Sequence, residues 1–253
     1  MIEYGNFVCM VDAGSSTESK ISKYSIIPFL KYSKIREIDC LFLTHGDSDH
    51  INAAEELIAQ SNSGVKIKRI VIADKQKITE YGNISELAKK YNVPVFEMKM
   101  GEKVVYKDLQ IRCLAPSLEL LKKEEASDNE SSMVLLLEKE NFQMLFTADV
   151  EGEGERELTN IINKIELSSS LVLKVAHHGS KNSTSENFLQ AVSPRISIIS
   201  CGKNNVYGHP HQETIQRLNA SGSTVYVTKD CGAIRITEDG RNVKAYRRKT
   251  NNN

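Results

Sequence analysis

Six histidines carry most of the chemical information in this sequence, because all of them fall into three short clusters. His45 and His50 enclose two aspartates in THGDSDH, and the other four lie in KVAHHGSKNSTS and NNVYGHPH. Neutral imidazole is the commonest metal ligand in proteins. Histidines used only for packing or at the surface would be spread along the chain. Their grouping therefore indicates a metal centre.

The first cluster combines imidazoles with carboxylates at informative spacings. His45 and Asp47 project to the same side of an extended loop, whereas Asp49 and His50 stand where a helix is expected to begin and turn in a second direction. Mixed nitrogen and oxygen ligands suit Zn²⁺, Mn²⁺ or Fe²⁺, and two such ions ~3.5–4 Å apart cleave phosphoryl or acyl bonds. The pattern predicts one or two divalent ions, Zn or Mn. A solvated loop in which Asp49 caps the helix is the simpler alternative.

Apolar strands precede every candidate cluster. LFLT ends before His45, LFTA before Asp149, LVLKVA before His177, and IISCGKNNVYG leads to His209. Loops at the carboxyl ends of sheet strands converge on one region, so residues far apart in sequence are expected to become neighbours. Strands and helices alternate over 6–98 and again over 153–227, with antiparallel strand pairs between them. This order predicts an α/β (α+β) fold. Its elements include strands over 38–43 and 65–73 and a helix from about Asp49, and the segments AIRIT and VKAYR are its last elements.

Composition bounds the remaining function classes. The 253 residues, 40% hydrophobic and 26% charged, suit one large folded domain or two small ones. The net charge is zero, so any preference for a polyanion must come from local patches. Five scattered cysteines without a C-x-x-C pair favour neither a thiolate zinc site nor a disulfide framework. The chain shows no signal peptide or long apolar run, and these features together favour a cytoplasmic location for the chain taken alone.

THGDSDH, FTADV, KVAHHGSKNSTS and NNVYGHPH, in this order, resemble the metallo-β-lactamase-fold hydrolases, and specifically the metallo-β-lactamase domain of ComEC-type DNA-uptake (competence) proteins. The resemblance runs from about residue 10 to 237. It implies an αββα sandwich of two mixed β-sheets with helices on both outer faces, here over 1–240, followed by a basic, flexible tail over 241–253. Such relatives carry a strand before the segment matching NFVCMVDAG. This chain starts too late to contain it, which suggests a fragment or a shortened free-standing relative.

The resemblance also implies a set of metal ligands. An aspartate replaces the second histidine of the superfamily's H-x-H-x-D-H pattern, and Asp149 takes the place of the bridging carboxylate. Residues 51–176 contain no histidine, which leaves one metal site a ligand short; Asn129 and Ser132 stand there instead, as in ComEC relatives. The predicted metal ligands are His45, Asp47, Asp49, His50, Asp149, His177 and His209.

His178 and His211 are not in this ligand set and need separate roles. Successive strand residues point to opposite faces, so His177 and His178 are not both expected to reach one ion, and His177 is preferred. His178 then contacts substrate, orients a carboxylate or packs structurally. His211 is expected to cap a helix or support a ligand. For catalysis, Asp49 or Asp149 accepts a proton, and His178 or Lys181 stabilises or protonates the leaving oxygen.

The resemblance implies a hydrolase that degrades single-stranded DNA, a phosphodiesterase of the DNA-uptake system. Basic residues outnumber acidic ones five to two over 174–217, and the loops there supply hydrogen-bond donors suited to phosphate. With no Trp, no platform for base stacking is evident. The predicted substrate-binding residues are Asn129, Ser132, Ser180, Lys203, Asn205 and His211.

Two other functions remain open at this point. One is a stand-alone hydrolase of the same fold acting on a lactone, a thioester or a small phosphodiester. The other is a metal-poor binding module, because one ligand is missing. If the chain is a fragment of a ComEC-type protein, association with a membrane channel and a place on the outer face of the cytoplasmic membrane are expected instead of the cytoplasm.

Overall fold

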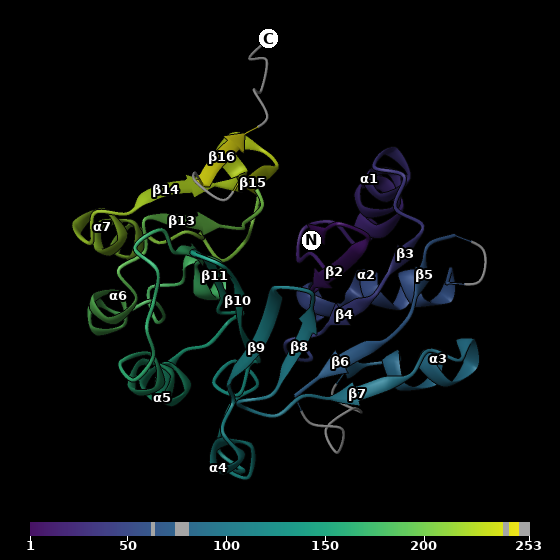
Figure 1. The fold of residues 1–253 in the computed structure, drawn as a ribbon, viewed down its shortest axis with the longest axis horizontal. Helices are drawn as coiled ribbons and strands as arrows, with labels where there is room; N and C mark the ends of the chain where they lie inside the picture. The colour runs from purple at the N-terminus through teal and green to yellow at the C-terminus, as the bar shows by residue number, and fades with distance from the viewer. Residues whose placement is uncertain (62–63, 74–80, 240–242, 248–253) are drawn as a thin grey trace. The chain divides into compact units, whose positions relative to one another are not determined.

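The computed structural model describes residues 1–61, 64–73, 81–239 and 243–247 (Figure 1). The chain divides into two compact units, Met1–Lys99 and Met100–Asn253. We call them unit 1 and unit 2. The sequence predicts one domain over 1–240, whereas each unit has a hydrophobic core of its own.

Unit 1 is built on a five-stranded sheet in the order β1-β2-β4-β6-β7. Its strands are β1 (Ile2–Tyr4), β2 (Phe7–Val11), β4 (Cys40–Phe42), β6 (Ile70–Ile72) and β7 (Val95–Glu97). β1 runs antiparallel to β2, and the other pairs are parallel. A short strand, β1, precedes the NFVCMVDAG segment and pairs with β2.

The predicted strands 38–43 and 65–73 are each interrupted. Their first parts, β3 (Glu37–Ile38) and β5 (Lys66–Ile67), pair with each other rather than with the main sheet. Asp39 and Lys68 lie at the two breaks, where the lysine Nζ contacts the carboxylate at 2.8 Å. The Asp39 carboxylate also accepts the Val8 N–H at 2.9 Å. A charged pair between the strand halves explains why the apolar runs are not continuous.

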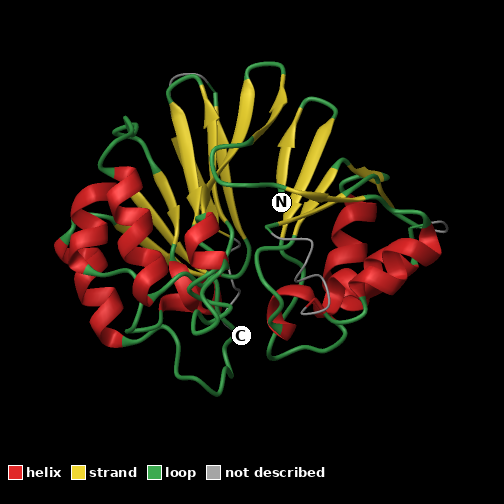
Figure 2. Cartoon of the chain, turned by 90° about the horizontal axis from the view of Figure 1, so that it is seen from below, coloured by secondary structure: helices red, strands yellow, loops and turns green. Residues whose placement is uncertain are grey.

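Helices cover one face of the unit 1 sheet (Figure 2). They are η1 (Ser22–Ile26, a π-helix), α1 (Ile27–Tyr32), α2 (Ser48–Ala59) and α3 (Ile84–Tyr91). Alternate residues of the central strands, such as Leu41 and Ile70, join a core with the apolar sides of these helices. The packed sheet and helix α2 hold the loop between β4 and α2, which carries THGDSDH.

Unit 2 contains a seven-stranded sheet in the order β14-β13-β12-β11-β10-β9-β8. It comprises β8 (Lys103–Tyr106), β9 (Leu109–Ala115), β10 (Val134–Lys139), β11 (Phe142–Phe146), β12 (Val172–Lys174), β13 (Ile196–Ile199) and β14 (Thr224–Val227). The pairs from β8 to β11 are antiparallel, and those from β11 to β14 are parallel. The helices α5 (Gly152–Ile162), α6 (Glu186–Val192) and α7 (Gln212–Ala220) pack on one face.

The opposite face of this sheet is covered near β12 and β13 by an antiparallel ribbon of β15 (Ile234–Glu238) and β16 (Val243–Arg247). Ile236, Val243 and Ala245 pack there against Val172 and Ile198. Residues 243–247 are therefore a strand, which corrects the prediction of a flexible tail for that part. Residues 241–242 and 248–253 lie outside the described residues.

The predicted pair of mixed sheets, each flanked by helices, is confirmed. Three short helical segments were not predicted: α4 (Leu118–Leu121), η3 (Ala176–Gly179) and α8 (Thr228–Cys231). Of these, η3 bears directly on function because it contains His177 and His178.

Candidate metal centre

The THGDSDH residues of unit 1 lie between the end of β4 and the first turn of α2. His45 and His50 are 3% and 4% exposed, and their ring centroids are 4.1 Å apart. Asp47 is the residue immediately before α2, and Asp49 lies in the first turn. We call His45, Asp47, Asp49 and His50 the unit 1 set. Two buried imidazoles in contact, next to carboxylates, give this loop the composition of a metal site.

Asp12 orients both imidazoles of the unit 1 set. Its carboxylate accepts the Nδ1 hydrogen of His50 at 2.8 Å and the hydroxyl hydrogen of Thr44 at 2.8 Å. Because that hydroxyl hydrogen is used, Thr44 Oγ1 accepts from Nδ1 of His45, 3.1 Å away. Both rings therefore carry their proton on Nδ1 and offer the lone pair of Nε2, the arrangement found in metal-ligating histidines.

The contact between His45 and Asp47 fits a shared cation. The Nε2 of His45 lies 3.5 Å from Asp47 Oδ2, and two ligands of one tetrahedral zinc ion are about 3.4 Å apart. Among the residues that the structure describes, this buried Nε2 makes no hydrogen bond. The neighbouring His45 lowers the pKa of the Asp47 carboxyl below its ordinary value, although burial opposes this. The simpler alternative made Asp49 the helix cap, but Asp49 lies inside the first turn of α2, and Asp47, which precedes the helix, makes no side-chain capping hydrogen bond.

The VDAG segment passes so close to the start of α2 that only glycine fits at position 14. The Ala13 N–H donates to the carbonyl of His50 at 2.8 Å, which holds this loop against the start of α2. A Cβ on Gly14 would lie 2.3 Å from the carbonyl oxygen of Asp49. Any side chain at this position would displace the backbone that carries Asp49 and His50.

Replacing Asp12 by asparagine is expected to weaken binding of Zn²⁺ or Mn²⁺ by about 10–100-fold, because losing such a support typically costs that much. The amide has about the same shape, but its NH2 group would face either the Thr44 N–H that donates to Oδ1 or the His50 and Thr44 hydroxyl hydrogens that both donate to Oδ2, so it cannot accept all three. Titration calorimetry with each metal measures the change. Exposed Glu3, replaced by glutamine, serves as the control, and equal affinities of the Asp12 variant and the wild type would refute the assigned role.

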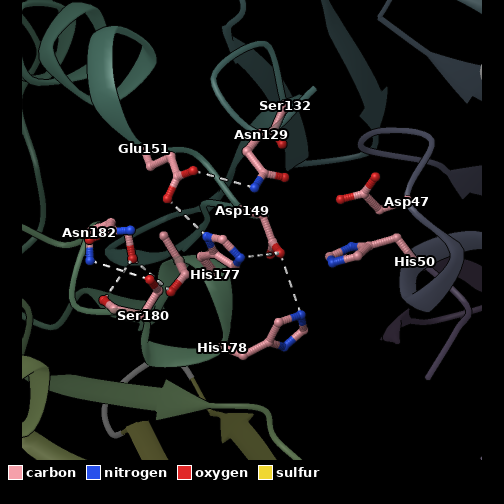
Figure 3. Close-up of polar contacts among 12 residues, drawn as sticks. Asp47, His50, Asn129, Ser132, Asp149, Glu151, His177, His178, Ser180 and Asn182 are labelled. Atoms are coloured by element: carbon pink, nitrogen blue, oxygen red, sulfur yellow. Dashed lines mark hydrogen bonds and ion pairs between the residues drawn. The ribbon is translucent and has the colours of Figure 1, made fainter. Parts of the chain in front are cut away.

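In unit 2, three imidazoles lie near the Asp149 carboxylate. We call Asp149, His177, His178 and His209 the unit 2 set. Asp149 follows β11 and is 3% exposed. Its Oδ2 lies 3.8 Å from the Nε2 of His177 and 3.5 Å from the Nε2 of His178. Figure 3 shows both rings directed at this carboxylate.

The two adjacent histidines therefore face the same carboxylate, whereas strand alternation predicts opposite directions for them. The argument from strand alternation was wrong because β12 ends at Lys174 and both residues lie in η3. Their φ angles are 46° and 53°, in the left-handed region that costs non-glycine residues energy. Consecutive left-handed residues turn both rings to one side. Strain of this kind at two histidines is a mark of a functional site.

The other nitrogen of each ring is held in place. His177 donates from Nδ1 to the Glu151 carboxylate at 3.0 Å, and His178 donates from Nδ1 to the carbonyl of Ser200 at 2.8 Å. Each ring therefore offers the lone pair of Nε2 on the side of Asp149. For His178 this favours a metal ligand over the proton donor that the sequence suggested.

His209 belongs to the same group of rings. Its centroid lies 5.6 Å from that of His177 and 6.2 Å from that of His178. The Asn205 side chain shapes the loop before it, accepting the His209 N–H at 2.7 Å and donating to the His209 carbonyl at 2.9 Å. Burial, together with the nearby imidazoles, lowers the pKa of His209 to about 4. The ring is therefore neutral, the state required of a ligand.

This low pKa predicts that the metal-free protein loses stability in mild acid. The unfolded chain protonates His209 near pH 6.5 and the folded protein only near 4, so its contribution is present above about 6.5 and is lost as pH falls toward 4. At pH 5 the loss is about 2 kcal/mol. Urea unfolding in chelator at pH 7.5 and pH 5 measures it, with His209→Gln as the control. Parallel losses in the wild type and His209→Gln would contradict the prediction.

Several predicted substrate-binding residues make hydrogen bonds within the protein. Ser132 is fully buried and donates to the carbonyl of Asp128, and Ser180 is buried with its Oγ accepting the Asn182 N–H. Neither hydroxyl is placed at the surface. Asn205 is engaged with its own loop, as described above. These contacts show that the three residues shape the loops around the site, and their contact with substrate stays a prediction.

The remaining predicted contacts have different surroundings. Asn129 donates to Glu151 at 3.4 Å and so supports the carboxylate that holds His177. His211 precedes α7, but its Nδ1 accepts the Lys181 N–H at 3.2 Å instead of capping that helix. Lys181 and Lys203 are exposed. They stay candidates for contact with a phosphate.

Comparison with known proteins identifies the family. Residues 1–203 match the metallo-beta-lactamase superfamily. The chain belongs to this superfamily. A metallo-beta-lactamase fold normally binds one or two divalent metal ions. Four imidazoles described above, those of His45, His50, His177 and His178, have Nδ1 held by an oxygen acceptor and fit such ions.

The curated relatives are competence proteins. The chain is 40% identical over 218 residues to ComE operon protein 3 of Bacillus subtilis, covering 85% of this chain and 26% of that protein. It is 28% identical over 222 residues to competence protein ComA of Neisseria gonorrhoeae, covering 88% of this chain and 28% of that one. The chain thus spans about a quarter of the length of these relatives.

Solved structures show the same fold at low sequence identity. The metallo-beta-lactamase fold protein YhfI from Bacillus subtilis has a TM-score of 0.55 and 13% identity, covering 89% of this chain and 85% of its own. CmlA, a diiron beta-hydroxylase from Streptomyces venezuelae, has a TM-score of 0.52 and 13% identity, and the match covers 75% of this chain and 43% of the CmlA chain. These likenesses establish the fold alone.

Sequence reasoning missed the groups that hold the ligand rings: Asp12, Thr44, Glu151 and the carbonyl of Ser200. A signal existed for two of them. Asp12 ends a strand just as His45 follows one, and Glu151 is two residues beyond Asp149. A polar residue at the carboxyl end of a strand is a reasonable candidate even when it is not a histidine.

Proposed function

We propose that this chain is a metal-dependent phosphodiesterase that degrades single-stranded DNA, using the unit 1 and unit 2 sets as metal ligands. The observation that carries the proposal is the Asp149 carboxylate with the Nε2 atoms of His177 and His178 at 3.8 and 3.5 Å. A buried carboxylate with two half-buried imidazoles suits the divalent ions that assist phosphoryl transfer.

A bound divalent ion would supply an activated water and a positive charge next to the scissile phosphate. The chain's own groups have distinct tasks. Asp12 and Glu151 keep the proton of His50 and His177 on Nδ1. Asp49 or Asp149 accepts the proton released by the attacking water. Lys181, exposed on the loop after η3, stabilises or protonates the leaving oxygen.

The DNA substrate is supported by the competence proteins to which the chain is similar, and by the exposed lysines of unit 2. We propose the same setting for this chain, in association with a membrane channel at the outer face of the cytoplasmic membrane. Among the described residues, no helix combines the length and apolar character needed to cross a bilayer.

A matrix of metals and substrates tests the proposal. Purified protein is depleted of metal, reloaded with Zn²⁺ or Mn²⁺, and incubated with single-stranded DNA, double-stranded DNA, a small phosphodiester, a lactone and a thioester. Metal-dependent cleavage of single-stranded DNA is the expected result. Faster turnover of a small ester than of any DNA would favour the small-molecule hydrolase, and absence of bound metal after reloading would favour the binding module. Either of these outcomes would overturn the proposal.

A further inference from the structure

We propose that the ring of Tyr207 is a stacking platform for a nucleobase of the strand that unit 2 helps to cleave. This inference rests on the proposed function and names the part of the substrate that the site recognises. It comes from one exposed aromatic residue beside the unit 2 set, which the sequence pattern did not single out.

Tyr207 is exposed and yet held against the site. Tyr207 is 61% exposed and Val206 88%, so an apolar tip projects from the loop that leads to His209. The Tyr207 ring stacks on the His209 ring at 5.7 Å with planes 23° apart. His209 in turn stacks on His178 at 6.2 Å and 21°. Tyr207 thus ends a column of nearly parallel rings that starts within the unit 2 set.

The loop that carries the ring is firmly shaped. Asn205 donates to the carbonyls of Gly202 and His209, and it accepts the His209 N–H. At the start of the loop, the Cys201 N–H donates to Thr228 Oγ1 at 2.9 Å. Little conformational freedom is left to lose when a planar ligand covers the ring, which favours binding.

Groups suited to a phosphate backbone lie on the neighbouring loop. The Lys181 N–H donates to His211, whose ring lies 5.0 Å from that of His209. Arg217 holds this loop through the carbonyls of Lys181, Ser183 and Thr184 at 2.9–3.1 Å. Its guanidinium is therefore occupied, and Lys181 on this loop and Lys203 on the loop that leads to Tyr207 are exposed cations. A flat apolar surface near a cation matches a nucleotide, with its planar base and charged phosphate.

The test compares two single-stranded oligonucleotides of equal length, one intact and one in which abasic residues flank every scissile phosphate. Base stacking on an aromatic ring is worth about 10-fold or more in affinity. For the wild type, KM for the abasic strand is therefore expected to exceed KM for the intact strand by about 10-fold. In Tyr207→Ala this ratio should fall to about one, whereas Tyr207→Phe should retain it and Tyr207→Trp should retain or increase it. Val206→Ala, altered at the same exposed tip, is the matched control and should keep the wild-type ratio.

Three outcomes would overturn the inference. An unchanged ratio in Tyr207→Ala would show that no base stacks there. An equal fall of kcat on both strands would show that Tyr207 only supports His209. A fall of the ratio in Val206→Ala matching that in Tyr207→Ala would indicate general apolar contact, as in protein docking. Wild-type protein that cleaves neither strand with either metal would refute the proposed function itself, so the two failures are distinguishable.

Discussion

Asp149→Asn should reduce the metal-dependent hydrolysis of a phosphodiester by at least about 10³-fold. The carboxylate is buried and faces two imidazole nitrogens at 3.5 and 3.8 Å, so its charge is placed for a cation. A metal ion contributes several kcal/mol of transition-state stabilisation, and each 1.4 kcal/mol changes the rate tenfold. Asparagine has about the same size but lacks the charge. Steady-state rates together with metal content per chain measure the effect.

The control for this variant is Asp108→Asn, on the exposed turn between β8 and β9. It should keep the wild-type rate and metal content. A melting temperature of Asp149→Asn close to that of the wild type would show that the fold is retained. Hydrolysis within tenfold of the wild-type rate would remove Asp149 from the site and with it the main support for the proposed function.

His50→Gln should cause a loss of similar size, although this residue belongs to the other unit. Its Nδ1 is held by Asp12, so Nε2 is the nitrogen offered to a cation, and glutamine cannot reproduce that lone pair in the same position. We expect hydrolysis to fall by at least about 10²–10³-fold and the content of divalent metal to decrease. Elemental analysis and rate measurements at saturating Zn²⁺ and Mn²⁺ check this.

Glu56→Gln, on the same helix α2 but outside the unit 1 set, is the matched control. Undiminished hydrolysis in His50→Gln, with loss only in Asp149→Asn, would mean that the unit 1 set takes no part in the reaction. The two variants together therefore ask whether both sets are needed.

The order of elements and the candidate ligands could be predicted because their patterns are local. The apolar run before His45 and the switch to helical periodicity after Asp49 lie within a few residues of each other. The breaks at Asp39 and Lys68 were not foreseen because they depend on contacts between strands. Strand β16 coincides with VKAYR, one of the closing elements expected from the sequence, although its basic composition also resembles that of a tail; its alternate residues pack on β12 and β13.

Within the site, residue types were predictable and backbone conformations were not. His177 and His178 follow an apolar strand, and nothing in KVAHHGS distinguishes an extended backbone from two left-handed residues. The preference for one histidine over the other followed from that wrong conformation. Roles that depend on a partner, such as the hydrogen bond by which Asp12 orients His50, can be assigned only once the folded backbone is known.

The β15–β16 ribbon has a practical consequence for expressing this protein. It shields Val172, Ile196 and Ile198 on one side of the seven-stranded sheet. Trimming the gene at codon 240 to remove the basic end would delete β16 and leave β15 without its hairpin partner. Water would then reach a β-branched surface that favours intermolecular association. A trimmed product is therefore expected in inclusion bodies, while the full-length product stays in the supernatant.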